Sequence, residues 1–301
     1  MRAHHNELAV PAVRALLGSC AVDGGATDEQ RTLIAALATG YFGLDLDLDG
    51  LEPLGPDATA ARFGPHDEKH RLVETMILLE LARHPASAAQ TERVEAYAAA
   101  LEVDNRWQSL ARDYLAGDCA LLVADYGRFA EGSQTEPALA NVDPADLPRE
   151  LHSLGLLPEG TLGRGFFDFY QRHGLAFPGE PGGGSVSLVA HDMSHVLAGY
   201  EPTPPEEVAL QAMLASACDG EHHFSGLMAS LGLFEIGMLP FPDITPKAGV
   251  LARPGAAATV ADGVRRGAIA HRDFATIDHW AVLDHQLEDL RHDLHIVERR
   301  A

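Results

Sequence analysis

Cysteine is scarce in this sequence. The 301 residues include three cysteines, Cys20, Cys119 and Cys218, which are widely spaced and odd in number. A disulfide framework is therefore not expected, and a reducing compartment fits better. Each cysteine lies in an alanine- and leucine-rich helical context, which favours a small buried side chain over a reactive nucleophile.

Positive charge is also scarce, and this shortage excludes one class of partner. Lysine and arginine together number 22 against 44 aspartates and glutamates, which gives a formal net charge of −22 at pH 7. Proteins bind nucleic acids through a basic surface, so a nucleic acid is not an expected partner. The same balance argues against a standing electrostatic attraction to anionic lipids.

The sequence lacks a long uninterrupted apolar run. Its first residues contain no stretch of signal-peptide type, so we expect a cytoplasmic protein. The most apolar segment, residues 224–241, contains Glu235, and we interpret it as a buried helix rather than a transmembrane segment. His222 and His223 precede this segment and point in different directions on a helix, and we expect both at the surface.

Helical patterns are abundant, whereas strand signals are almost missing from the first 132 residues. Alanine, leucine and glutamate recur there with the 3.6-residue period of a helix. We predict an all-α fold with two helical domains, residues 1–132 and residues 149–301. The linker between them, residues 133–148, is rich in proline and small polar residues. The helices predicted in the first domain cover residues 8–17, 28–37, 70–82, 90–101 and 106–129.

One stretch combines side chains that bind metals. It reads HDMSH at residues 191–195, within a segment whose apolar positions have helical spacing. At about 100° of rotation per residue, His191, Asp192 and His195 fall within an arc of about 100°. The two imidazoles can therefore bind one ion, with Asp192 as a third ligand or as a partner that orients an imidazole.

Glu207 is expected to complete this site. Residues 203–206, Thr-Pro-Pro-Glu, have the form of a capping box, which would occupy Glu206 and leave Glu207 to point elsewhere. The short loop before them would return the chain beside the first helix. Two nitrogens with one or two oxygens suit zinc, iron or manganese. With 16 histidines in the chain, a solvated pair on the surface is the alternative.

The motif resembles the HDxxH-x11-E signature of the coenzyme Q (ubiquinone) biosynthesis family. Similarity extends to LPEGTLG at residues 157–163, to FFDFY at 166–170, and to the C-terminal stretch from Trp280 to Ile296. It covers about half of the chain. Two features depart from the family pattern: Ser194 replaces a bulky residue before the second histidine, and the family's basic stretch is matched only loosely by Arg265, Arg266 and Arg272. These arginines either hold an anionic group or offset a helix dipole.

The resemblance implies a role in ubiquinone or related prenylated-quinone biosynthesis, in which the ring carboxylate is lost and replaced by oxygen. It implies a divalent metal ion, zinc or iron, held by His191, His195 and Glu207, with Asp192 as a further ligand or as the catalytic base. The expected partner is a prenylated aromatic or quinone-like lipid. The resemblance also leaves room for contact with other quinone-biosynthesis enzymes, for a homodimer and for a peripheral position on the inner membrane.

Three functions stay open at this point. The first is a metal-dependent decarboxylase or hydroxylase. The second is a non-catalytic lipid-binding scaffold for a biosynthetic complex. The third is a metal-dependent hydrolase, because Asp192 stands where His-Glu-x-x-His peptidases carry their general base. Small residues are frequent between residues 209 and 238, which suits either close helix packing or a groove for a prenyl tail. The glycine-rich loop at 178–185 is either a connection or a gate over the site.

The N-terminal domain has a resemblance of its own, to the TerB-like domain of tellurite resistance. An acidic turn with Asp23 and Gly24 follows an apolar helix and precedes Asp28 and Glu29, as in that family. The place of the second such turn, residues 82–92, lacks the Asp-Gly pair, so the paired acidic metal site of the family is not expected. We interpret the first turn as a bend followed by a helix cap.

Overall fold

The computed structural model confirms the all-α fold. No strand forms over the described part of the chain, where two isolated bridges are the sole β-type contacts. The predicted linker lies outside this part, except for residues 145–148. Side chains are not described for residue 6 or residues 66–68. The described ranges are 6–64, 66–130, 145–218, 220–241, 244–270 and 272–299.

The N-terminal segment forms seven α-helices over its described residues. Four of the predicted helices are confirmed, as α1, α2, α4 and α5. The prediction of one helix over 106–129 is wrong, because Gly117 adopts a left-handed φ of 68° and ends α6 before α7 begins. The elements are α1 (Asn6–Ser19), α2 (Asp28–Phe42), η1 (Leu48–Gly50), α3 (Pro56–Ala60), α4 (His66–Leu81), α5 (Ala88–Leu101), α6 (Gln108–Ala116) and α7 (Cys119–Ala130).

The turn before α2 has the predicted form of a bend followed by a cap. Asp23 and Gly24 both have positive φ angles, and Thr27 forms a capping box with Gln30. The Asp23 carboxylate accepts a hydrogen bond from the Ser87 hydroxyl at the start of α5. The acidic turn is thus fully used in joining helices.

The C-terminal segment is helical as well. Its apolar stretch is largely buried from Phe224 to Leu239, whereas Phe241 is exposed. The helix in this stretch ends at Leu231 and continues as a π turn that carries the fully buried Glu235. The elements are α8 (Leu147–Ser153), η2 (Leu154–Leu156), α9 (Leu162–His173), α10 (Leu188–Ala198), α11 (Pro204–Ala217), α12 (Glu221–Leu231), η3 (Gly232–Ile236), α13 (Ala256–Ala270), η4 (His279–Val282) and α14 (Leu287–Asp293).

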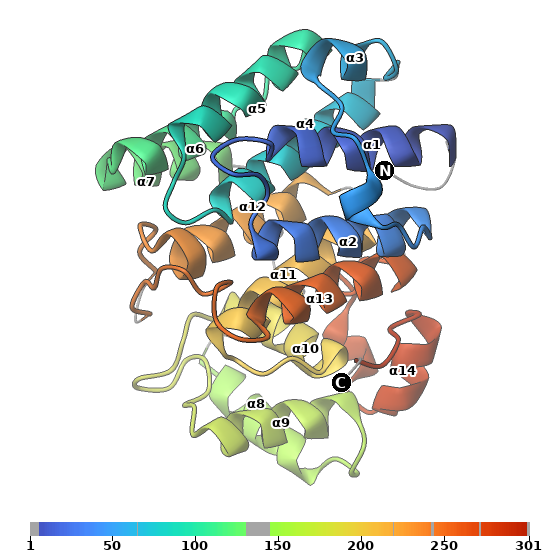
Figure 1. The fold of residues 1–301 in the computed structure, drawn as a ribbon. Coiled ribbons are helices and arrows are strands. Elements are labelled where there is room, and N and C mark those ends of the chain that lie inside the picture. The colour runs from blue at the N-terminus through green and yellow to red at the C-terminus, as the bar shows by residue number, and fades with distance from the viewer. Residues whose placement is uncertain are drawn as a thin grey trace.

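The helices form a stack with α11 and α13 at its centre (Figure 1). Helices α5 to α7 lie at one end of the stack, and α8 and α9 lie at the other. Two glycines allow α13 to approach α11 closely. A Cβ atom at Gly263 would lie 2.3 Å from the carbonyl oxygen of Ala209, and one at Gly267 would lie 2.0 Å from that of Met213. The small residues predicted to favour close packing do so here.

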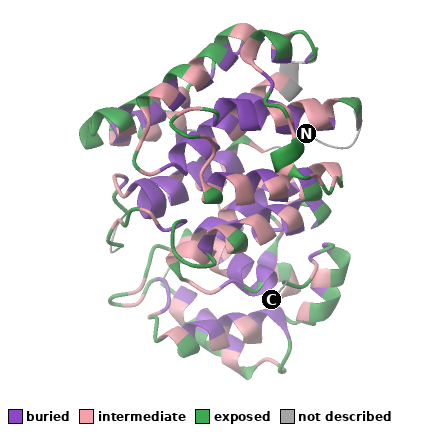
Figure 2. Ribbon diagram, viewed as in Figure 1, coloured by how far each residue is buried: buried purple, intermediate pink, exposed green. Residues whose placement is uncertain are grey.

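One contiguous hydrophobic core runs through both segments (Figure 2). Helix α2 packs on α13, and Trp107 meets Phe224 edge to face with ring centroids 5.7 Å apart. The division into two domains stays a prediction, because the described residues share this core. No helix in the described ranges is both long and apolar enough to cross a bilayer.

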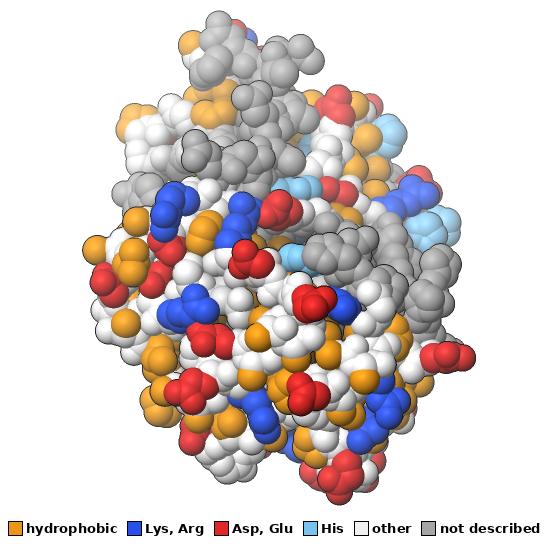
Figure 3. Space-filling model, turned by 90° about the horizontal axis from the view of Figure 1, so that it is seen from above, with side chains coloured by type: hydrophobic (Ala, Val, Ile, Leu, Met, Phe, Trp, Pro, Cys, Tyr) orange, Lys and Arg blue, Asp and Glu red, His pale blue; other side chains and the backbone are white. Residues whose placement is uncertain are grey.

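The surface mixes both signs of charge. On the face that Figure 3 shows, acidic and basic side chains are interspersed among apolar ones over its described part. Over the described residues, several surface charges are paired, as in Arg31 with Asp49 and Arg112 with Glu95. Each such pair uses one basic and one acidic residue, so the excess of acidic residues remains.

Candidate metal centre

Helix α10 places two histidines on one face. His191 and His195 are one helical turn apart, and their Nε2 atoms lie 3.1 Å from each other. His195 is almost completely buried, whereas about a quarter of the His191 side chain is exposed (25%). The ring of Phe169 from α9 stacks on His195, with ring centroids 5.7 Å apart. The pair thus opens toward solvent on the His191 side.

Glu207 on α11 faces both imidazoles. Its Oε2 atom lies 3.1 Å from Nε2 of His191 and 3.2 Å from Nε2 of His195. The three atoms form a nearly equilateral triangle. The spacing of HDMSH and Glu207 predicted this juxtaposition, and the structure brings the three residues together.

The capping box that was used to place Glu207 is wrong in detail. Thr203 precedes α11 but makes no side-chain cap. Glu206 instead accepts a hydrogen bond from the backbone N–H of Glu201 at 2.6 Å and pairs with Arg299. The Glu206 carboxylate is therefore engaged away from the histidines, as expected, but by Glu201 and Arg299 rather than by a helix cap. Glu207 is left to face the histidines.

The second nitrogen of each imidazole has a partner. Nδ1 of His195 donates to the backbone oxygen of Tyr200 at 3.0 Å, which leaves the Nε2 lone pair available in the neutral ring. Nδ1 of His191 lies 3.3 Å from the side-chain amide of Gln211. Gln211 was not predicted as part of the site. It stands one helical turn after Glu207 on α11 and therefore on the same face.

Asp192 does not join the triangle. Its Oδ2 atom accepts a hydrogen bond from the Tyr170 hydroxyl, which comes from α9. Burial raises the pKa of the Asp192 carboxyl, against the opposing influence of His191 and of the Tyr170 hydrogen bond. Burial and the nearby Asp192 charge raise the pKa of the Tyr170 hydroxyl. Neither role predicted for Asp192 at the metal is seen in this geometry, because its carboxylate lies outside the triangle and its hydrogen bond is to Tyr170 rather than to an imidazole.

The charges at the triangle are mutually stabilising. Burial alone would raise the pKa of Glu207, but its hydrogen bonds to His191 and His195 outweigh burial and hold the pKa below its usual range. Burial alone would lower the pKa of His191, whereas the hydrogen bond and charge of Glu207 raise it. The carboxylate is therefore ionised and ready to act as a ligand.

The residues at the triangle fit a metal ion. Zinc bonds to nitrogen and oxygen are about 2.0–2.1 Å long, so neighbouring ligand atoms in a tetrahedral site stand about 3.3 Å apart. The observed separations of 3.1, 3.1 and 3.2 Å match this spacing. Two neutral imidazole nitrogens and one carboxylate also form the donor set of zinc and non-haem iron sites.

Three arginines fix the C-terminal end of α10. Arg291 donates to the backbone oxygens of Val196 and Leu197, and Arg266 donates to that of Ala198. The third arginine, at position 299, donates to the oxygen of residue 199. These carbonyl groups have no partner within the helix, so the guanidinium groups both satisfy them and offset the helix dipole.

The arginines at positions 265 and 266 are engaged by the protein. Arg266 is buried, with 2% exposure, and donates to the backbone oxygens of Val297 and Ala198, while its Nη1 atom has no hydrogen-bond partner. Arg265 pairs with Asp262 at 2.7 Å, and Arg272 is exposed. These contacts favour a structural role for Arg265 and Arg266, and the anion-binding interpretation stays a prediction.

The loop at 178–185 is held in place. Phe177, at its start, is buried and stacks on Tyr170 with ring centroids 4.8 Å apart. The Glu180 carboxylate accepts a hydrogen bond from the backbone N–H of Phe177 at 2.9 Å and pairs with His152. These contacts favour the interpretation as a connection over that of a gate.

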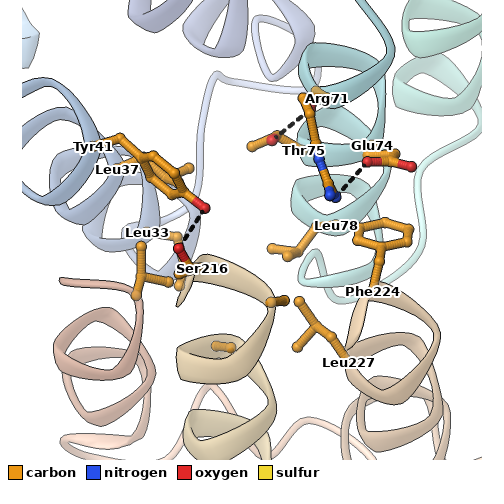
Figure 4. Close-up of a pocket in the computed structure, with 13 residues that line it drawn as sticks. Leu33, Leu37, Tyr41, Arg71, Glu74, Thr75, Leu78, Ser216, Phe224 and Leu227 are labelled. Atoms are coloured by element: carbon orange, nitrogen blue, oxygen red, sulfur yellow. Dashed lines mark hydrogen bonds and ion pairs between the residues drawn. The ribbon is translucent and has the colours of Figure 1, made fainter. Parts of the chain in front are cut away.

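A cavity lies between the two segments (Figure 4). Helices α2 and α4 form one wall, and α11, α12 and α13 form the other. Inside it Arg71 pairs with Glu74, and the Tyr41 hydroxyl donates to the backbone oxygen of Ser216. Its volume is about 70 Å³, against about 300–1,000 Å³ for typical small-molecule sites.

Two predictions about histidine and cysteine exposure are wrong. His223 is buried, with 4% exposure, and His222 is half-buried. The structure brings His223 close to Cys218 and to Asp273, which comes much later in the sequence. Cys20 is buried as predicted, but Cys119 is exposed and Cys218 is half-buried.

Comparison with known proteins gives a distant likeness in structure. No protein-family model matches the sequence, and no curated protein is significantly similar to it. The chain is similar to the crystal structure of a protein from Nostoc punctiforme PCC 73102 that is provisionally assigned to ubiquinone biosynthesis. The match covers 78% of this chain and 100% of that one, with 19% identity and a TM-score of 0.36. Likeness at this level defines neither a family nor an activity.

Proposed function

We propose that this protein binds one divalent metal ion through His191, His195 and Glu207 and uses it in prenylated-quinone biosynthesis. The observation that carries the proposal is the triangle of Nε2, Nε2 and Oε2 atoms with edges of 3.1–3.2 Å. The assignment to quinone biosynthesis rests on the resemblance of HDMSH and Glu207 to the family signature.

The number of converging ligands supports a catalytic role. Structural zinc sites are closed by four protein ligands, whereas catalytic sites use three and keep a position for water or substrate. Three side chains converge here among the described residues, and His191 is partly open to solvent. A bound ion would supply Lewis-acid activation of a carboxylate or hydroxyl group on an aromatic ring.

Asp192 and Tyr170 are the groups that would hold a proton beside the metal ligands. The Tyr170 hydroxyl donates to Oδ2 of Asp192, and the carboxyl has a pKa raised by burial. An acid or base whose pKa moves toward the working pH transfers protons more effectively. We assign Asp192 the role of base and Tyr170 the role of its hydrogen-bond partner. Zinc and iron both suit the ligands, and a redox step would favour iron or another redox-active ion over zinc.

The test is the metal content of the protein. The protein is purified without a histidine tag after growth with iron, zinc and manganese, and bound metal is measured by mass spectrometry. We expect one equivalent at this site, and its loss in the His191→Ala/His195→Ala variant. The matched control is His285→Ala/His292→Ala, which removes two exposed histidines and should leave the content unchanged. A metal content that the His191→Ala/His195→Ala change does not lower would contradict the proposal.

The quinone part of the proposal has a separate test. Lipids that co-purify with the wild type are extracted and analysed for prenylated aromatic rings. A prenylated ring in the wild-type extract would support the proposed substrate class. If protein that carries its metal yields extracts without such compounds, the metal site would stand and the proposed substrate class would be contradicted.

A further inference from the structure

A second group of metal-binding side chains lies where three helices end or begin. Cys218 directly follows α11, and His222 and His223 stand in the first turn of α12. Asp273 comes from the loop after α13. One ligand atom each from Cys218, His223 and Asp273 lies within 4.8 Å of the others.

Both imidazoles approach the same carboxylate oxygen. Nε2 of His223 lies 2.9 Å from Oδ2 of Asp273, and Nε2 of His222 lies 3.4 Å from it. The other oxygen, Oδ1, accepts hydrogen bonds from the backbone N–H groups of Ala275 and Thr276 at 3.1 and 3.2 Å. The carboxylate is thus fixed by the backbone with one oxygen turned toward the histidines.

The nitrogen atoms that face this oxygen lie within ion-pair distance of it but form no well-aligned hydrogen bond. Nε2 of His222 and Nε2 of His223 are both buried, and neither has a hydrogen-bond partner of good geometry. Ion pairs of this kind leave buried polar atoms poorly aligned, at the cost that such atoms carry. A cation bound beside the Asp273 oxygen would replace the poorly aligned contact of His223 by a bond to the metal.

The backbone makes room for this arrangement. The rings of His222 and His223 lie 3.9 Å apart, which places them on the same side of the helix start. A Cβ atom at Gly220 would lie 2.5 Å from Cε1 of His222 and 2.8 Å from its Nδ1. The absence of a side chain at position 220 therefore allows the His222 ring to fold back toward Asp273.

We propose that Cys218, His223 and Asp273 form a second metal site, independent of the first, and that it takes zinc. One sulfur, one nitrogen and one oxygen are donors that zinc accepts, and the His222 ring stands beside them against the same Asp273 oxygen. The nitrogen-to-oxygen separation of 2.9 Å at His223 lies near the tetrahedral spacing of about 3.3 Å. Such a site would tie the α11–α12 turn to the end of α13.

The thiolate makes this site distinguishable from the first one, which holds no sulfur. Replacing zinc by cobalt(II) gives a thiolate-bound ion a strong near-ultraviolet charge-transfer band. We expect this band in the wild type and in His191→Ala/His195→Ala, and its loss in Cys218→Ser. Cys119→Ser is the matched control, because it removes an exposed cysteine outside the cluster and should keep the band.

Metal content gives a second readout on the same variants. The wild type should bind two equivalents of zinc, and Cys218→Ser/His223→Ala should bind one less than the wild type. Circular dichroism is the control that checks whether each variant is folded. A cobalt-loaded wild type without the band, or a band that survives in Cys218→Ser, would overturn the second site without touching the first.

Discussion

Nε2 of His84 lies 2.7 Å from Oε1 of Glu235, and this pair connects the N-terminal helices to the C-terminal ones. Glu235 is completely buried in the π turn after α12, and its Oε2 atom accepts a hydrogen bond from the backbone N–H of Leu251 at 2.7 Å. Nδ1 of His84 lies 2.9 Å from the Tyr114 hydroxyl. A buried carboxylate in the shared core thus depends on a histidine about 150 residues earlier in the sequence.

Removing His84 should leave this carboxylate without its partner. We expect His84→Ala to lower the free energy of unfolding by about 3–5 kcal/mol, since an unpaired buried charge is costly. Urea denaturation measures the change. In the His84→Ala/Glu235→Gln double variant the loss should be smaller than the sum of the two single losses. Strictly additive losses would contradict a direct interaction between the two side chains.

Glu80 should make stability fall as the pH rises. Burial raises its pKa to about 7, against the opposing hydrogen bond from Thr91, while the ordinary value is 4.5. The folded state therefore holds its proton more tightly than the unfolded chain. The resulting stabilisation is present below pH 4.5 and is lost as the pH approaches 7. Glu80→Gln should raise the unfolding free energy by up to about 3 kcal/mol at pH 8 and have little effect at pH 4. Equal effects at both pH values in urea titrations would refute this assignment.

Glycine at position 267 should be essential for the packing of α13 on α11. A Cβ atom there would lie 2.0 Å from the carbonyl oxygen of Met213, which is backbone and cannot move aside alone. We expect Gly267→Ala to destabilise the protein by about 2–4 kcal/mol through overpacking. Gly127→Ala in α7 is the control, because a Cβ there meets nothing within 4 Å. Helix propensity alone should make that control about 1 kcal/mol more stable. The same sign for both variants in thermal unfolding would contradict the prediction.

Arg291 should act on the proposed metal ligands through α10. Its guanidinium donates to the backbone oxygens of Val196 and Leu197, directly after His195. Losing these bonds in Arg291→Gln frees the last turn of the helix, and we expect the zinc Kd to rise about tenfold, as for other changes behind metal ligands. Competition with a chromophoric chelator measures the Kd. Arg253→Gln, at an exposed position, should leave it unchanged. An unchanged Kd in Arg291→Gln would show that the helix end does not position His195.

Local patterns predicted the fold class and the triangle well, because both depend on spacing along the chain. His191 and His195 meet since they are four residues apart on a helix, and Glu207 follows from a short connection between neighbouring helices. The break at Gly117 was missed because the alanine and leucine pattern continues across it on both sides. Its left-handed backbone, rather than the apolar period, ends the helix.

Tertiary contacts were beyond the reach of such patterns. Asp273 comes from a loop that follows α13, and its meeting with Cys218 and His223 depends on how α11, α12 and α13 pack. No spacing in the sequence brings these residues together. The roles of Arg266 and Arg291 were hidden for the same reason, because each caps a helix other than its own.

The capping of α10 by distant arginines also sets an order of events during protein synthesis. Arg266, Arg291 and Arg299 follow their carbonyl acceptors by 68, 94 and 100 residues, respectively. A chain leaves the ribosome from its N-terminus and folds in that direction. The two histidines are therefore exposed to the cell well before the groups that fix their helix have been made. Selection of the proposed metal ion by the finished geometry would therefore be a late event, because the nascent chain offers His191 and His195 on a helix end that is still uncapped.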